Sequence, residues 1–228
     1  MYTTATPRHE WKYEVSRAEY LAIRQRLRTL MRPDPHTNPD GTYRIRSIYF
    51  DDADDRALWE KRDGVRLREK YRIRWYNDDH SFIALERKRK IDALGYKESV
   101  VLRLIEAQAI LDGDTAFLRT RPEPLCWDFL RETERGCRPR VTVSYRREPY
   151  LYAPGNVRVT FDSEIRTSLF HRAALSEIRG ISATDTSEMM LMEVKYDAYL
   201  PQIIADLIQP STLYRQAFSK YAACRKYG

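Results

Sequence analysis

The chain is poor in glycine, with only eight in 228 residues. These glycines are too far apart to form a Gly-x-Gly-x-x-Gly fingerprint or a Gly-x-x-x-x-Gly-Lys loop. The two common backbone devices for holding a nucleotide phosphate are therefore absent. Any phosphate that this protein binds must be held by side chains.

Cysteine and histidine are also scarce. The four histidines form no His-Glu-x-x-His motif, and Cys126, Cys137 and Cys224 form no Cys-x-x-Cys pair, so we expect no thiolate zinc site. The odd cysteine count and the absence of a signal-like N-terminus indicate a cytoplasmic protein with free thiols. No apolar stretch approaches the ~20 residues that cross a bilayer. Any association with a membrane would then require a partner.

Basic residues outnumber acidic ones, with 40 Lys and Arg against 33 Asp and Glu, which gives a net charge of +7. A hydrophobic fraction of 43% is too high for a disordered chain. We expect one folded domain over residues 1–228. A nucleic acid fits the charge, but the aromatic residues alternate with basic ones as core partners do, so no nucleic-acid partner is expected.

Alternating polar and apolar residues predict eight strands. They cover residues 9–15, 43–51, 65–76, 81–90, 95–102, 140–150, 156–165 and 188–197. Helical patterns cover residues 103–112, 125–135, 200–208 and 213–227, and a capping box of Ser16 and Glu19 begins another helix that reaches residue 30. Residues 32–41 predict a loop. We therefore expect an α+β fold, a mostly antiparallel eight-stranded β-barrel with flanking helices and a C-terminal helix.

The predicted strand 65–76 carries a basic residue at every second position. Alternate residues of a strand share one face at ~6.6 Å spacing, so five cations form a row while the opposite face is mainly apolar. The row consists of Arg66, Arg68, Lys70, Arg72 and Arg74. It either faces water or lines a cavity.

Three other predicted strands also gather charged residues on one face, which favours a cavity. These groups are Glu10, Lys12 and Glu14; Glu86, Lys88 and Lys90; and Glu193 and Lys195. If they line one barrel, the cations converge in a narrow space, where each unpaired buried charge costs several kcal/mol. We therefore expect that only a bound polyanion balances them.

Six short motifs then identify a family resemblance. They are Arg8-x-Glu10-x-Lys12-Tyr13, Ile48-Tyr49-Phe50-Asp51, Lys70-x-Arg72-x-Arg74-Trp75-Tyr76, Leu85-Glu86-Arg87-Lys88, Met192-Glu193-Val194-Lys195-Tyr196 and Phe218-Ser219-Lys220-Tyr221. In this order, over residues 8 to 221, the set resembles the VTC (vacuolar transporter chaperone) domain. That domain is the polyphosphate-polymerase branch of the triphosphate tunnel metalloenzymes, the CYTH-like superfamily. The resemblance implies a barrel whose interior is a phosphate-binding tunnel.

The resemblance also implies roles for individual residues. The expected catalytic residues are Arg72, Arg74, Lys88, Lys97 and Glu193. The expected substrate-binding residues are Lys12, Arg147, Ser219 and Lys220, to which the alternation of the strands adds Arg66, Lys70, Arg158 and Lys195. Glu193, with Glu10 as the second ligand, would hold Mn²⁺ or Mg²⁺. Two alternatives stay open: Glu193 as the salt-bridge partner of a tunnel arginine, and Ser219 as a helix N-cap.

The function that the resemblance implies is metal-dependent phosphoryl transfer from ATP to a growing polyphosphate chain, with a separately encoded membrane protein as a further partner. Arg8 stands where the hydrolytic members of the superfamily have a glutamate, which favours the polymerase. Ala217 stands where close polymerase relatives tend to have a basic residue. A tunnel triphosphatase and a noncatalytic module that senses polyphosphate stay open as alternatives.

Overall fold

The computed structural model describes residues 2–92, 94–168, 175, 181–182, 190–209, 214–215 and 217–225. They form one ten-stranded sheet in the order β2-β7-β3-β4-β5-β6-β1-β10-β8-β9, and a further pairing of β7 with β8 closes it. The strands are β1 (Tyr2–Val15), β2 (Arg32–Pro33), β3 (Tyr43–Asp51), β4 (Leu67–Tyr76), β5 (Asp79–Ile91), β6 (Leu94–Leu102), β7 (Arg138–Tyr152), β8 (Val157–Ser168), β9 (Ile181–Ser182) and β10 (Met190–Tyr196). Because every pairing of the described strands is antiparallel, the predicted eight-stranded barrel is confirmed, with β2 and β9 as short additions.

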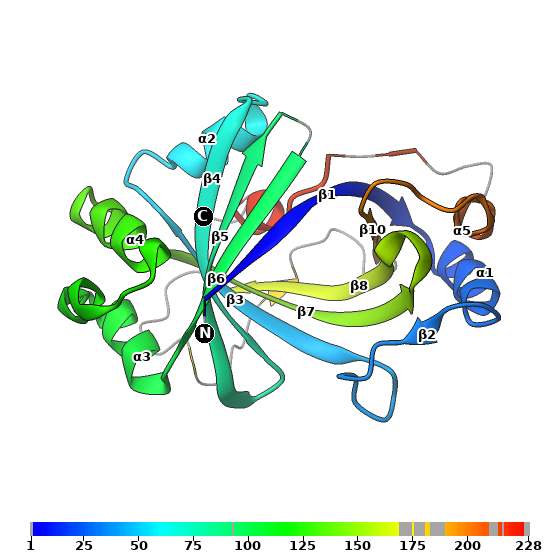
Figure 1. Ribbon diagram of the computed structural model, residues 1–228, viewed down its shortest axis with the longest axis horizontal. Helices are drawn as coiled ribbons and strands as arrows, with labels where there is room; N and C mark the ends of the chain where they lie inside the picture. Colours follow the sequence, from blue (N-terminus) through cyan, green and yellow to red (C-terminus); the bar gives the residue numbers. More distant parts are fainter. Residues whose placement is uncertain are drawn as a thin grey trace.

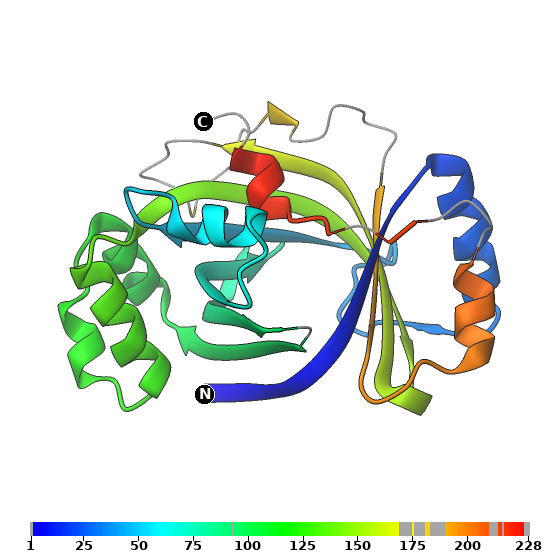
Figure 2. The same cartoon turned by 90° about the horizontal axis from the view of Figure 1, so that it is seen from above.

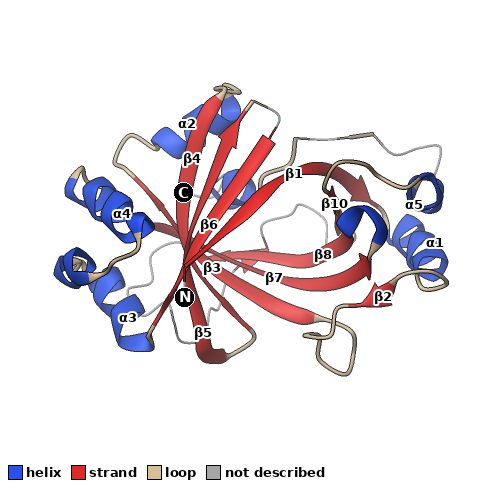
Figure 3. Cartoon of the chain, in the orientation of Figure 1, coloured by secondary structure: helices blue, strands red, loops and turns tan. Residues whose placement is uncertain are grey.

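The helices flank the barrel on opposite sides. They are α1 (Arg17–Leu27), α2 (Arg56–Arg62), α3 (Leu104–Asp112), α4 (Pro124–Glu134), α5 (Gln202–Ile208) and α6 (Lys220–Cys224), with 3-10 turns η1 (Ala116–Thr120) and η2 (Pro154–Asn156). Figures 1 and 2 show α3 and α4 together at one side of the barrel and α1 and α5 together at the other. Helices α2 and α6 lie next to each other and cover another part of the barrel wall (Figures 2 and 3).

The apolar faces of the strands pack outward against these helices. Tyr71, Ile73 and Trp75, the apolar face opposite the basic row, are buried in one cluster with Phe129 of α4. The Phe129 ring lies 5.3 Å from the Tyr71 ring. Glu69, which interrupts this face, lies opposite Arg89 in the register. Since the apolar residues of β4 face the helices, the alternate basic residues are directed into the barrel.

Two helix starts follow from the local sequence. At α1 the predicted capping box is confirmed: Glu19 N donates to Ser16 Oγ at 3.3 Å, and Ser16 N donates to a Glu19 carboxylate oxygen at 2.7 Å. At α6, Ser219 is the N-cap, and its hydroxyl accepts a 3.4 Å hydrogen bond from Ala222 N. The predicted helix 213–227 is therefore wrong at its start, since residues 217–219 are not helical, while residues 213, 216, 226 and 227 lie outside the described residues.

Several predicted boundaries differ from the structure. Strand β1 begins at Tyr2, because its first residues pair with β6, which the sequence of β1 alone does not reveal. The predicted loop 32–41 contains β2, and the strand predicted at 65–76 begins at Leu67. Residues 188 and 189 of the last predicted strand lie outside the described residues. None of the described helices is long and apolar enough to span a membrane.

Helix α2 was not predicted, and its start explains why. Asp55, its N-cap residue, has a positive φ of 55° and makes no side-chain cap. The first amides are instead bonded by carboxylates of the preceding turn: Ala57 N donates to Asp51 at 2.9 Å and Arg56 N to Asp52 at 3.0 Å. Such a cap from outside the helix leaves no local capping signal.

Candidate functional site

Most of the predicted site residues meet on the inner face of the barrel. Residues that are paired across neighbouring strands share a face of the sheet. The register pairs Lys12 with Glu193 and Arg72 with Glu86. Contacts with these residues and their neighbours also place Glu10, Lys70, Arg74, Lys88, Lys97, Arg147, Lys195 and Lys220 there.

Glu86 is the centre of one group of cations. It is 3% exposed, and its Oε2 lies 2.7 Å from Arg72 Nε and 2.5 Å from Arg72 Nη2. Lys97 Nζ lies 2.6 Å from Glu86 Oε1, and Arg74 Nη1 lies 4.0 Å from Oε2. Burial alone would raise the pKa of Glu86, but the charges of Arg72, Arg74 and Lys97 hold that pKa far below its usual value. Glu86 is therefore an ionised anchor for three cations.

Hydroxyl groups of β3 and β7 hold the same two arginines. Arg72 Nη1 donates to Tyr49 Oη at 2.9 Å. Arg74 Nε donates to Ser47 Oγ at 3.1 Å, and Arg74 Nη2 donates to Tyr145 Oη at 3.2 Å. Because a guanidinium has five N–H donors in a planar fork, these contacts fix both side chains and leave donors for a phosphate oxygen.

Asp162, on β8, is the centre of a second group. Arg147 Nε and Nη2 donate to its two carboxylate oxygens at 2.6 and 2.7 Å, and Lys220 Nζ lies 2.5 Å from Oδ2. The Arg147 guanidinium also donates to Glu193 Oε2 at 3.3 Å. The salt bridge between Glu193 and a tunnel arginine, which the sequence left open, is thus present.

Glu10 and Glu193 lie on the neighbouring strands β1 and β10 and form a carboxylate pair around the ammonium of Lys12. Lys12 Nζ lies 2.9 Å from Glu10 Oε1 and 3.8 Å from Glu193 Oε1. Lys88 Nζ lies 2.7 Å from Glu10, and Lys195 Nζ lies 3.3 Å from Glu193. Burial alone would raise the pKa of Glu193, but Lys195 and its other neighbours hold it well below the usual value.

This pair fits a hard divalent cation that shares its coordination with a substrate. Among the described residues there is no group of three or more His, Cys, Asp and Glu side chains that could hold a metal ion alone. Mg²⁺, however, is commonly held by one or two carboxylates, with water and substrate phosphates as its other ligands. The donor set of Glu10 and Glu193 therefore suits Mn²⁺ or Mg²⁺ bound together with a polyphosphate.

The inner face is only partly balanced in charge. Among the described residues that meet at this centre, nine basic side chains surround four carboxylates, so basic groups outnumber acidic ones. The cations are Lys12, Lys70, Arg72, Arg74, Lys88, Lys97, Arg147, Lys195 and Lys220, and the carboxylates are Glu10, Glu86, Asp162 and Glu193. The expectation that only a bound polyanion balances these cations is thus wrong in part, since buried carboxylates offset some of the charge.

Lys70 differs from its neighbours because no described carboxylate pairs with it. Its ammonium lies 5.6 Å from the centre of the Tyr49 ring and 5.9 Å from that of Tyr221. Burial lowers the pKa of Lys70 to about 7, with Lys88 and Lys12 acting in the same direction and Tyr49 against them. An anion beside Lys70 would restore its charge.

Three predicted residues lie away from this centre. Arg66 precedes β4 and is exposed, with Nε 2.5 Å from Asp92 Oδ1. Arg158 lies opposite Lys195 in the register and so shares the inner face, but its Nη2 lies 2.9 Å from Asp34 Oδ2, so its charge is already paired. Ser219 lies next to Lys220 but uses its hydroxyl oxygen as the cap of α6.

Sequence reasoning missed other residues of the site. Asp162 lies four residues after Arg158 in a predicted strand, so the same alternation that selected Arg158 also indicates Asp162. Tyr49 lies in the motif that begins at Ile48, but the sequence assigns no role to it. Lys61 Nζ, which donates to Ala217 O at 3.2 Å, is carried by α2 and had no signal because that helix was not predicted.

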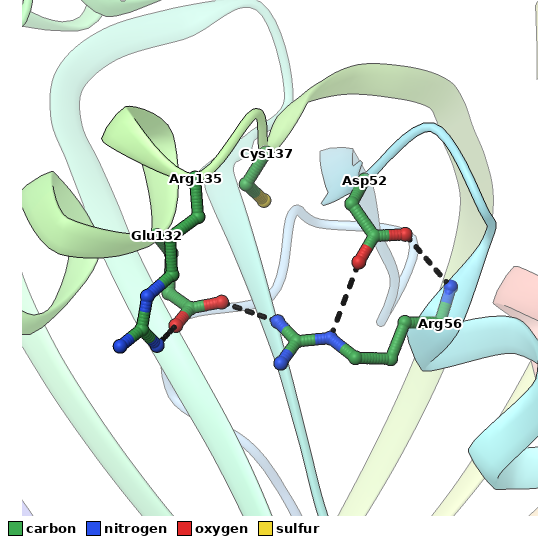
Figure 4. A pocket seen from close by; sticks show the side chains of 5 residues that line it. All are labelled: Asp52, Arg56, Glu132, Arg135 and Cys137. Atoms are coloured by element: carbon green, nitrogen blue, oxygen red, sulfur yellow. Dashed lines mark hydrogen bonds and ion pairs between the residues drawn. The ribbon is translucent and has the colours of Figure 1, made fainter.

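A small pocket lies between α2 and α4 (Figure 4). Arg56 crosses it, with Nε 3.3 Å from Asp52 Oδ2 and Nη2 paired with Glu132, while Arg135 Nη1 lies 3.1 Å from Glu132 Oε1. Burial raises the pKa of Cys137, the fifth lining residue, to about 12, so its thiol is not activated. Since its charges already pair with one another, the pocket anchors α2 to α4 and is not a second reaction site.

Comparisons with known proteins agree with the fold. The model of the VTC domain family matches residues 7–227. The fold is similar to that of HpAC1 from Hippeastrum, provisionally named an adenylyl cyclase and said to have a dominant triphosphatase activity, with a TM-score of 0.58, 12% identity and 96% of each chain covered. A protein from Bacillus halodurans, provisionally named an adenylate cyclase, has a TM-score of 0.51 and 17% identity over 82% of this chain and 79% of its own. No curated protein matches the chain.

Proposed function

The chain belongs to the VTC domain family, and from this premise we propose that it transfers the γ-phosphoryl group of ATP to the end of a polyphosphate chain inside its barrel. The observation that carries the proposal is the positive excess of the inner face, where arginine forks and lysines surround a pair of carboxylates. Such a site suits a polyanion and a divalent cation together. The described interior offers no cysteine or histidine nucleophile close to the carboxylate pair, and none is required.

The arginines and lysines would do most of the catalytic work. Phosphoryl transfer passes through a loose transition state with charge spread over the phosphoryl oxygens, so catalysis depends on positioning and on electrostatic stabilisation. Hydrogen bonds to Glu86 and to hydroxyl groups fix the guanidinium groups of Arg72 and Arg74, so their remaining N–H donors would be positioned for those oxygens. Lys88 and Lys97 add positive charge from β5 and β6.

The remaining residues of the site would hold the triphosphate and the metal. Lys12 and Lys220 would bind the outer phosphates, and Arg147 would orient Glu193 for its ligand role. Glu10 and Glu193 would hold Mn²⁺ or Mg²⁺, which when bound neutralises phosphate charge as a Lewis acid. The attacking end of a polyphosphate chain is already an anion, so no general base is needed.

A tunnel triphosphatase is the second candidate. The Glu10–Glu193 pair is the observation that favours it, because a metal held there could activate a water molecule as readily as it could bind the end of a polyphosphate chain. HpAC1, which has the same fold, is said to have dominant triphosphatase activity. Against this candidate, Arg8 replaces a third carboxylate, and Arg8 Nε lies 2.9 Å from Asp197 Oδ1 instead of joining the pair.

The substitution Glu193→Gln tests the proposal. It removes one metal ligand and leaves the cations in place, so we expect the variant to bind tripolyphosphate at least as tightly as the wild type while its Mn²⁺-dependent consumption of ATP is lost. Glu134→Gln is the matched control, because Glu134 also pairs with an arginine but is half exposed on α4. Normal turnover by Glu193→Gln would refute the assigned metal site. A wild type that binds tripolyphosphate but consumes no ATP with Mn²⁺ or Mg²⁺ would show that the protein is a sensor.

A further inference from the structure

Three basic residues gather where β4 and β5 reach the end of the barrel near α2. They are Lys61 of α2, Arg68 of β4 and Lys90 of β5, and we call them the mouth cluster. The register pairs Arg68 directly with Lys90. Burial lowers the pKa of Lys61 and that of Lys90, and the nearby charge of Arg68 lowers both further. Arg68 and Lys90 are therefore neighbours on one face of the sheet, and Lys61 of α2 lies near both.

The strand register makes this cluster costly for the protein alone. Arg68 pairs with Lys90, and on the same face the next pair is Lys70 with Lys88. Like charges directly opposite each other destabilise a sheet. Deeper in the barrel, Glu10, Glu86, Asp162 and Glu193 offset the cations, but no carboxylate of the described residues forms an ion pair with a residue of the mouth cluster. The charge at the mouth is thus available to an anion from outside.

Lys61 links the mouth to the interior. Its Nζ donates to Ala217 O at 3.2 Å, and Lys12 Nζ donates to the next carbonyl, Phe218 O, at 3.0 Å. The two lysines therefore bind neighbouring carbonyl groups of the same short segment. Lys61 therefore places a positive charge beside Ala217, the position at which close polymerase relatives tend to have a basic residue. Lys12 in turn contacts Glu10 and Glu193, so this segment connects the mouth cluster to the carboxylate pair.

We propose that the mouth cluster is an anion subsite that binds a segment of polyphosphate extending beyond the phosphates held inside the barrel, so that the protein prefers long chains to triphosphate. This inference rests on the proposed function, because it takes the interior to be a phosphate site. The cluster itself contains no aromatic side chain, and the half-exposed Trp59 of α2 already has the Arg62 guanidinium 4.7 Å from its ring centre. A linear inorganic anion therefore suits it better than a single-stranded nucleic acid.

The test compares two triple variants of equal charge. The first is Lys61→Ala, Arg68→Ala, Lys90→Ala, and the matched control is Arg17→Ala, Arg28→Ala, Arg32→Ala, which removes three exposed cations near α1. Isothermal titration calorimetry measures the affinity of each protein for tripolyphosphate and for a size-fractionated linear polyphosphate several times longer. We expect the mouth variant to bind the long chain about tenfold more weakly than the wild type, because three partly exposed ion pairs are lost. Its affinity for tripolyphosphate should stay within about twofold, and the control should bind both anions as the wild type does.

The other outcomes separate this inference from the proposed function. If the wild type binds tripolyphosphate and the long chain with equal affinity, the mouth subsite is refuted and the interior site stands. An equal loss in the control would show that only net charge matters, which also refutes the subsite. If the mouth variant loses affinity for an oligonucleotide rather than for polyphosphate, the occupant is wrong. If the wild type binds neither phosphate anion, the proposed function fails along with the inference.

Discussion

Replacing Glu86 with glutamine perturbs the charge balance of the barrel most directly. Glu86 is 3% exposed and pairs with Arg72 at 2.5 Å and with Lys97 at 2.6 Å, with Arg74 at 4.0 Å. Glutamine keeps the size of the side chain but removes its charge. The three cations would then face one another without their central anion, so Glu86→Gln should destabilise the protein when no anion is bound.

The structure sets the size of this effect. Removing one partner of a buried ion pair costs about 3–5 kcal/mol. Lys97 is 44% exposed along its side chain and can turn toward water, so we take the lower end, about 3 kcal/mol. At about 2–4 °C per kcal/mol for a chain of this size, the melting temperature should fall by roughly 6–12 °C at pH 7.

The pH dependence follows from the lowered pKa of Glu86. A carboxylate whose pKa is lower in the folded than in the unfolded state stabilises the protein above its unfolded pKa, and this contribution is lost as the pH falls toward the folded value. The difference between wild type and Glu86→Gln should therefore be complete at pH 7. It should begin to shrink once the pH falls to the ordinary value of 4.5 and below.

Thermal melting followed by circular dichroism measures this difference in buffer free of phosphate and sulfate, with Glu134→Gln as the control. An exposed ion pair such as that of Glu134 changes stability by no more than about 0.5 kcal/mol. Tripolyphosphate at a hundredfold excess over its dissociation constant should stabilise the wild type by about 2.7 kcal/mol, and Glu86→Gln by more at the same concentration, because it replaces the missing charge. A melting temperature for Glu86→Gln equal to that of the wild type without anion would refute this account of the barrel.

Three further predictions concern single functional groups. Arg72→Ala or Arg74→Ala should lower turnover, measured by steady-state kinetics, by roughly two to three orders of magnitude, as expected for loss of one transition-state donor, and lysine should rescue it only in part. Full activity of the double variant would show that these arginines have no catalytic role. Because the pKa of Lys70 lies at about 7 in the anion-free protein, tripolyphosphate should bind with uptake of a proton, and its affinity should rise as the pH falls through 7. Calorimetry in buffers of different ionisation enthalpy measures the proton uptake, and an unchanged uptake in Lys70→Met would refute the assignment. Ser219→Ala should cost about 1 kcal/mol by removing the N-cap bond to Ala222, measured by urea unfolding, whereas a loss of phosphate affinity without a loss of stability would assign Ser219 to the ligand.

The parts of the fold that alternation controls could be predicted from the sequence. The basic row of β4 and the apolar residues Tyr71, Ile73 and Trp75 lie on opposite faces as expected, because successive side chains of a strand point to opposite sides. The Ser16 and Glu19 capping box also formed, since both of its hydrogen bonds lie within one helical turn.

The remaining features depend on contacts between distant segments. Helix α2 begins on carboxylates of the turn before it, and the C-terminal helix starts late because Ser219 caps it; neither follows from helical periodicity. The pairing of Asp162 with Arg147 and Lys220 needs the closure of β7 on β8, so the sequence reasoning expected too large an uncompensated charge. Lys61 joins the site only because α2 packs beside the segment that contains Ala217.

The fate of the γ-phosphate of ATP tests the central claim most directly. The wild type is incubated with Mn²⁺ and ATP labelled at the γ-phosphate, and the products are separated on a gel stained for polyphosphate and by chromatography. The account predicts that the label enters a polymer in the same amount as ADP is formed, with little free orthophosphate. If orthophosphate carries most of the label, the protein hydrolyses triphosphate and the polymerase assignment is contradicted.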